Sequence, residues 1–100
     1  MQQFADWIHQ TTTGRPVLVS DNPAFDWQFI NYYLHHFVGT NPFGFSGRRI
    51  GDLYAGMVKD ASKATEWKKF RVTRHTHNPV DDALGNAEAL LKFKELGLKL

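Results

Sequence analysis

The sequence predicts a helix-rich α/β fold whose β-sheet is incomplete. Four segments have the apolar spacing of helices, whereas only one compact run, residues 15–20, has the composition of a buried strand. A lone buried strand leaves backbone groups unpaired, so it needs partner strands that the rest of the chain does not obviously supply. We therefore expect a single domain over residues 1–100 that lacks the first strands of its sheet.

The first half of the chain reads as helix, strand, helix. Apolar residues at helical spacing predict a short helix over residues 4–9, which the turn residues 11–14 end. The β-branched run 15–20 follows as the strand. Asp21 or Asn22 caps the next helix, with Pro23 at its first position, and this helix ends near Gly39. Its predicted apolar face consists of Phe25, Phe29, Ile30, Tyr33, Leu34 and Phe37.

The second half reads as loop, helix, basic connector, helix. A loop over residues 41–47 precedes a helix that contains Ile50 and Val58, with Asp52 as a candidate cap. Residues 62–75 have no clear period, and residues 70–73 are a candidate short strand. Asn78 caps the last helix, with Pro79 at its first position and Asp81 placed as in a capping box. The inner face of this helix is predicted to contain Ala83, Leu84, Ala87, Leu90, Leu91 and Lys94, and Gly97 ends it.

Composition excludes several classes of function. The 42% hydrophobic content and fourteen aromatic residues are typical of an ordered globular domain. The absence of cysteine excludes disulfides, thiolate zinc clusters and thiol catalysis, so that any metal is held by oxygen or imidazole. Neither a membrane span nor a signal peptide is found in the sequence, so we expect a soluble, cytoplasmic protein without a membrane partner.

Basic residues are concentrated in one part of the chain. Residues 48–75 contain eight Lys or Arg against three acids, a local balance of +5, and the remainder carries −3. Together with Trp67 and Phe70, such a stretch can follow a phosphate backbone and stack on bases, although a solvated loop and helix face also explains it. The candidate nucleic-acid-binding residues are Arg48, Arg49, Lys68, Lys69, Arg71 and Arg74.

Two short clusters of polar residues stand at predicted helix starts. Asp26 lies one turn into the helix that follows the strand, and His77 stands just before the last helix, with Asp82 one turn inside it. Carboxylates bind hard cations such as Mg²⁺, and a neighbouring imidazole can deprotonate a water that the cation holds. Acidic residues in a first helical turn are also favoured by the macrodipole, so that Asp26, Asp81 and Asp82 have an alternative explanation as helix stabilisers.

Taken together, the clusters resemble two motifs of the DEDDh-type 3′-5′ exonucleases, which have a ribonuclease-H-like fold. Residues 21–30 are similar to the second motif, with Asn, a small residue, Phe and Asp before an apolar helix. Residues 77–84 are similar to the third motif, a His five positions before an Asp at the start of the last helix. The resemblance extends over most of the chain, and it implies that Asp26 and Asp82 hold the metal and that His77 is the general base.

The implied reaction is hydrolysis of the terminal phosphodiester at single-stranded 3′ ends of DNA or RNA, by a two-metal mechanism with Mg²⁺ or Mn²⁺. The family's first motif, a strand that carries Asp-x-Glu, is absent from the chain. A fragment, a gene start set too far downstream and a shortened product with another role all explain its absence. Two alternatives to an exonuclease therefore stay open: a catalytically silent nucleic-acid-binding module, and a remnant that forms homo-oligomers through an exposed sheet edge.

Overall fold

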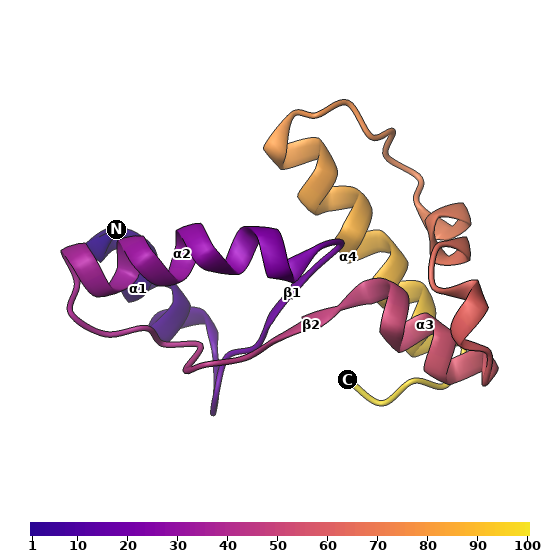
Figure 1. Cartoon of the computed structure of the whole chain (residues 1–100), viewed down its shortest axis with the longest axis horizontal. Coiled ribbons are helices and arrows are strands. Elements are labelled where there is room, and N and C mark those ends of the chain that lie inside the picture. The colour runs from indigo at the N-terminus through magenta and orange to yellow at the C-terminus, as the bar shows by residue number, and fades with distance from the viewer. The chain divides into compact units, whose positions relative to one another are not determined.

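The computed structural model describes all residues, 1–100, and belongs to the α/β class with a predominance of helix. The chain forms two compact units, residues 1–48 and 49–100. The elements in chain order are α1 (Gln2–Thr11), β1 (Leu18–Ser20), α2 (Pro23–Phe37), β2 (Gly47–Arg49), α3 (Ile50–Val58), η1 (Ala61–Lys63), η2 (Glu66–Phe70) and α4 (Pro79–Glu95), where η denotes a 3₁₀ helix (Figure 1).

In the first unit, α2 packs against α1 and β1. The core of this unit is small and contains the buried residues Ala5, Ile8, Leu34 and Phe43. The loop after α2 delivers Phe43 to this core because the Asn41 side chain accepts from the Phe43 N–H at 2.9 Å and donates to Asn31 at 2.9 Å. The strands β1 and β2 lie side by side as a two-stranded parallel sheet (Figure 1).

The predicted strand is shorter than expected, and its partner was not predicted. Only Leu18–Ser20 pairs as a strand, so residues 15–17 of the expected run lie outside it. The partner β2 consists of Gly47, Arg48 and Arg49, which directly follow the expected loop and have no strand-like composition. Backbone pairing, and not side-chain preference, therefore defines this strand. Gly47 lies close to β1, since a Cβ there would stand 3.2 Å from the Leu18 carbonyl oxygen.

In the second unit, α3 packs against η1, η2 and α4, and α4 also packs against η2. The buried apolar side chains are contributed by all of the longer elements and are Ile50, Tyr54, Ala55, Trp67, Ala89 and Phe93. Rings of Tyr54, Phe70 and Phe93 contact one another with centroids 5.7–5.9 Å apart, in two edge-on pairs and one stacked pair that suit aromatic packing. The core of the second unit therefore holds η2 against α4, just before the connector that leads to the α4 start.

Three expectations for the second unit were wrong. Residues 70–73 do not form a strand, because Glu66–Phe70 closes into a 3₁₀ helix and the following residues bond to side chains of α4. Asp52 is not the cap of α3; the cap position is Arg49, and Asp52 lies in the first turn, where it pairs with Arg49 at 3.2 Å. The inner face of α4 contains Gly85, Ala89 and Phe93, whereas Leu84 and Leu91 of the predicted face are more than half exposed.

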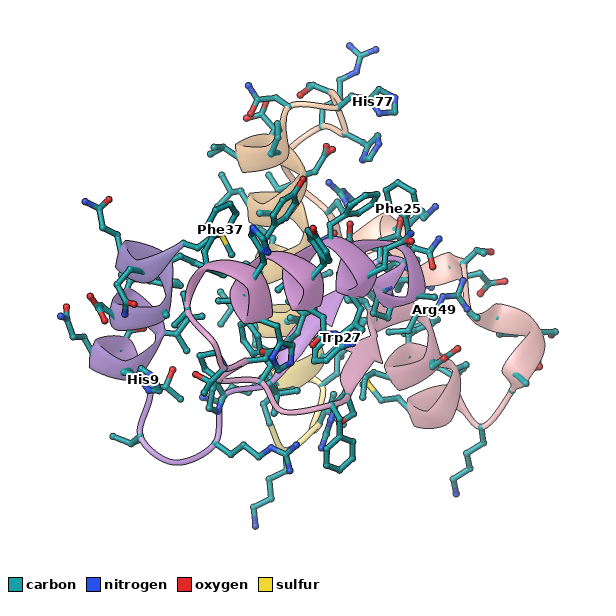
Figure 2. All side chains as sticks on the ribbon, turned by 60° about the vertical axis from the view of Figure 1, so that its left-hand side comes forward. His9, Phe25, Trp27, Phe37, Arg49 and His77 are labelled. Carbon is teal, nitrogen blue, oxygen red and sulfur yellow. The ribbon has the colours of Figure 1, made fainter.

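The predicted face of α2 is also largely exposed. Leu34 is buried, but Phe25, Phe29, Tyr33 and Phe37 each keep between 44% and 63% of their surface accessible. These four aromatic residues are spaced by four positions and therefore lie along one side of α2, with edge-on contact between Phe25 and Phe29 and stacking between Tyr33 and Phe37. Figure 2 shows Phe25 and Phe37 projecting from α2.

Candidate metal and phosphate site at the start of helix α4

The start of α4 is held by a network of short polar contacts. Asn78 is the cap residue, and its Oδ1 accepts a hydrogen bond from the Val80 N–H at 2.9 Å, while Pro79 occupies the first helical position. Asp81 does not bond back to the cap as a capping box requires. Instead, it accepts from the Thr76 hydroxyl at 2.7 Å, and the Thr76 oxygen accepts from the Asn78 N–H at 3.3 Å. The carboxylate therefore reaches the cap through a hydroxyl.

His77 occupies the turn that joins the connector to α4. Its φ of +64° lies in the left-handed region, which is uncommon for residues other than glycine. The side chain is exposed and makes no hydrogen bond, and Figure 2 shows it projecting into solvent from the end of the connector. Its ring stands edge-on to that of His75, with centroids 4.6 Å apart. The imidazole is therefore free to act on a bound molecule.

Asp82 lies one turn inside α4, beside both imidazoles. His75 Nδ1 is 3.1 Å from Asp82 Oδ1, and single ligand atoms of His75, His77 and Asp82 all lie within 4.8 Å of one another. Oδ1 of Asp82 is buried and has no hydrogen bond of acceptable geometry. A buried carboxylate oxygen without a donor is costly unless a cation or a protonated imidazole faces it. The sequence prediction that His77 and Asp82 reach one point agrees with this geometry.

Arg71 supports the first turns of α4 from beneath. Its side chain is only 9% exposed; Nη1 donates to Asn86 Oδ1 at 2.8 Å, and Nη2 donates to the Asp82 carbonyl at 3.3 Å. The guanidinium lies over the Trp67 ring, 5.8 Å from its centroid, and fills the space beside Gly85, where a Cβ would stand 2.7 Å from Arg71 Cζ. Unlike the other predicted nucleic-acid-binding residues, Arg71 is therefore packed inside the second unit.

A second contact fixes the connector one turn further along α4. Glu88 accepts from the Thr73 N–H at 2.8 Å and from the Thr73 hydroxyl at 3.2 Å. The backbone hydrogen bond from Thr73 is the main reason that the pKa of Glu88 lies below its ordinary value, although desolvation opposes the shift. With Arg71, this contact fixes the segment that carries His75 and His77 to the helix that carries Asp82.

Asp26 lies in the first unit, in the first turn of α2 and directly after the short segment that follows β1. Its carboxylate is half-buried, and no hydrogen bond or ion pair satisfies it. The macrodipole favours an acid at this position, and an unpaired carboxylate is available for a cation. Its convergence with Asp82 on one metal stays a prediction.

The remaining basic candidates differ in their surroundings. Arg48, Lys68 and Arg74 are exposed. Nζ of Lys69 lies 5.5 Å from the Tyr54 ring centroid and 5.3 Å from that of Phe70. Arg49 pairs with Asp52. The second unit as a whole carries ten Lys or Arg against seven acids, a net charge of +3.

Several residues of the site were missed by the sequence prediction. His75 was not among the predicted site residues, and its Nδ1 lies 3.1 Å from Asp82 Oδ1. Gly85, Asn86 and Glu88 were not singled out. The only signal for Gly85 and Asn86 was their spacing of three and four residues after Asp82, which places them on the same side of α4. No sequence signal marked Glu88.

None of the helices combines the length and the apolar character that crossing a membrane requires. A scan against protein-family models found no match. The chain is, however, similar to the 3′-5′ DNA exonuclease Cap18 of Escherichia coli, with 32% identity over 106 aligned residues. The alignment covers 99% of this chain and 57% of that protein, so the chain spans little more than half the length of its relative. This similarity supports a relationship to a 3′-5′ exonuclease.

Proposed function

We propose that the chain provides the second and third motifs of a 3′-5′ exonuclease that removes nucleotides from single-stranded 3′ ends of DNA. The observation that carries this proposal is the joint placement of His77 and Asp82 at the start of α4, with a buried oxygen of Asp82 that lacks a hydrogen bond. The similarity to a DNA exonuclease along almost the whole chain supports the same reading and favours DNA over RNA. In this proposal the fold is a partial ribonuclease-H-like fold of the DEDDh type.

The donor set suits a hard divalent ion. Asp82 and Asp26 would hold Mg²⁺ or Mn²⁺, because each offers a carboxylate oxygen that no hydrogen bond occupies. When bound, such ions lower the pKa of a coordinated water and offset the negative charge that develops at phosphorus. Arg71 Nη2 forms an ion pair with Asp82 Oδ1 at 3.9 Å, but this distance is too long for a hydrogen bond, so the lone pairs of that oxygen are not occupied by a donor.

His77 would take the proton from the attacking water. It is exposed and unbonded, and so it can reach a phosphodiester that approaches the start of α4. The backbone N–H groups of the first helical turn and the positive end of the helix dipole also favour an anionic phosphate there. Asp81 has a structural part in this scheme, since Thr76 occupies its carboxylate. Because the chain lacks Asp-x-Glu, we expect the isolated chain to be very weakly active or inactive.

The test is end-labelled single-stranded DNA incubated with the chain and Mn²⁺, beside a Mn²⁺ titration followed by electron paramagnetic resonance. We expect Mn²⁺ binding that Asp82→Asn and the double variant Asp26→Asn/Asp82→Asn weaken. Asp6→Asn is the matched control, because Asp6 is an exposed acid on α1. Any 3′-to-5′ ladder should disappear in His77→Asn, a change that retains a residue tolerant of the left-handed backbone. A ladder or a Mn²⁺ site that survives the double substitution would defeat the assignment.

A catalytically silent nucleic-acid-binding module is the second candidate, and the exposed basic side chains of the second unit favour it. It predicts affinity for single-stranded DNA that falls steeply with salt and is accompanied by no cleavage. Arg74→Gln and Lys68→Gln should each reduce the salt dependence, whereas Lys99→Gln near the C-terminus serves as a control of equal charge. Affinity that is indifferent to salt would exclude this candidate.

A further inference from the structure

His75 is the one member of the cluster at the α4 start that the proposed reaction does not use. It stands 3.1 Å from the buried oxygen of Asp82, and its ring is edge-on to that of His77. The three side chains together offer two imidazole nitrogens and one carboxylate oxygen within 4.8 Å. This donor set differs in kind from the carboxylates that bind Mg²⁺.

The chemistry of two imidazoles and one carboxylate favours borderline transition ions. Zn²⁺, Co²⁺ and Ni²⁺ bind imidazole nitrogen well, whereas Mg²⁺ prefers oxygen and keeps its waters. In a tetrahedral zinc site with bonds of about 2.0–2.1 Å, neighbouring ligand atoms lie roughly 3.4 Å apart. The His75–Asp82 distance is already close to this value, and the longer separations can close by rotation of the two exposed imidazole rings.

The surroundings limit how far the ligands must move. Arg71 and the Thr73–Glu88 contact fix the connector to α4 on the chain segment just before His75. Asn78 fixes the helix start just after His77. A ligand set on such anchored backbone loses less conformational entropy on binding than one on a free loop.

We propose that His75, His77 and Asp82 form a binding site for a single borderline transition ion, for which Zn²⁺ is the probe. The site leaves at least one coordination position open, because the cluster supplies three protein ligands. A further consequence rests on the proposed function: an ion held by His77 blocks the nitrogen that would accept a proton, so Zn²⁺ inhibits the exonuclease. Binding itself does not depend on that step.

The experiment is isothermal titration of the metal-free full chain with Zn²⁺, repeated with Co²⁺ followed by its visible absorption. We expect one equivalent to bind, with the absorption intensity of a low-coordinate Co²⁺ site. His75→Ala, His77→Asn and Asp82→Asn should each weaken binding, by roughly 10- to 100-fold, as changes to a metal site commonly do. His9→Ala, an exposed histidine on α1 shown in Figure 2, should leave the affinity unchanged. Far-UV circular dichroism verifies that each variant is folded.

The outcomes separate this inference from the proposed function. Zn²⁺ affinity that is unchanged in His75→Ala, or lost when a millimolar excess of Mg²⁺ is present, overturns the metal site. Zn²⁺ binding that requires His75, in a chain whose Mn²⁺ binding is unchanged in Asp26→Asn/Asp82→Asn, supports the site and counts against the proposed function. Nuclease activity that requires Asp82 but is indifferent to Zn²⁺ contradicts the inhibitory consequence alone.

Discussion

Gly85 provides a direct test of whether Arg71 positions the site. In the interior of an exposed helix, Gly→Ala normally stabilises by about 1 kcal/mol, because glycine loses more backbone entropy on folding. At Gly85 the added Cβ would stand 2.7 Å from both Cζ and Nε of Arg71, so the guanidinium must move. We therefore expect the usual sign to reverse.

The magnitude follows from the contacts that Arg71 would lose. Displacing the guanidinium breaks its 2.8 Å hydrogen bond to Asn86 and its contact with the Trp67 ring. A hydrogen bond to a charged group contributes about 1.5–3 kcal/mol, and the helical preference of alanine offsets about 1 kcal/mol of the loss. The expected net effect is a loss of about 0.5–2 kcal/mol, or roughly 2–10 °C in Tm for a chain of this size.

The assay is urea-induced unfolding followed by far-UV circular dichroism, with Gly56→Ala as the matched control. Gly56 also lies within a helix, α3, but a Cβ there meets nothing within 4 Å. We expect Gly56→Ala to raise the free energy of unfolding by about 0.5–1 kcal/mol. If Gly85→Ala stabilises the chain as much as Gly56→Ala does, the Arg71 guanidinium can move aside without loss of stability, and the argument that it supports α4 is refuted.

Three further predictions concern single contacts of the second unit. Asn78→Ala should lower the free energy of unfolding by about 1 kcal/mol in urea titrations and Asn78→Ser by much less, because serine retains a capping oxygen. Lys59→Gly should raise the free energy of unfolding by roughly 0.5–1 kcal/mol, because Lys59 has a left-handed φ of +59°, which is unfavourable for any residue with a side chain. A loss of stability would contradict this. The pKa of Glu88 lies below its ordinary value in the folded chain, so its stabilising effect is full above about pH 4.3 and is lost as pH falls through the folded pKa. Unfolding at several pH values should therefore show Glu88→Gln less stable than the parent near neutrality and equal to it in strong acid, and a constant difference would exclude ionised Glu88 as the cause.

The ends of α2 and α4 were predictable because they depend on neighbouring residues. Pro23 and Pro79 stand at the first positions of α2 and α4 as expected, and Gly97 ends α4 with a φ of +110°. The N–H groups of Gly97 and Leu98 bond back to the Lys94 and Phe93 carbonyls, as in the Schellman motif. Such signals depend only on residues close in the sequence, and so they can be recognised without the structure.

The buried faces were harder to predict because they depend on what lies opposite. On α4 the leucines suggested one face, but the helix turns Gly85, Ala89 and Phe93 inward. Gly85 is required there by the Arg71 guanidinium, a polar group that hydrophobic periodicity does not register. The strand β2 escaped prediction for a related reason, since its residues are Gly, Arg and Arg and only pairing with β1 makes them a strand.

The candidate site follows the same division between local and distant information. The spacing of five residues between His77 and Asp82 crosses one helix start, so sequence alone predicts their meeting at the first turn of α4. His75 was placed beside Asp82 by contacts that involve residues from 71 to 88, which no short motif records. The same contacts bring a second imidazole, that of His75, to the proposed metal site. Measuring Zn²⁺ and Mn²⁺ affinities in His75→Ala therefore tests whether His75 is itself a metal ligand or only positions Asp82. If only the Zn²⁺ affinity falls, the connector contributes a ligand of its own. If both affinities fall equally, His75 acts only through Asp82.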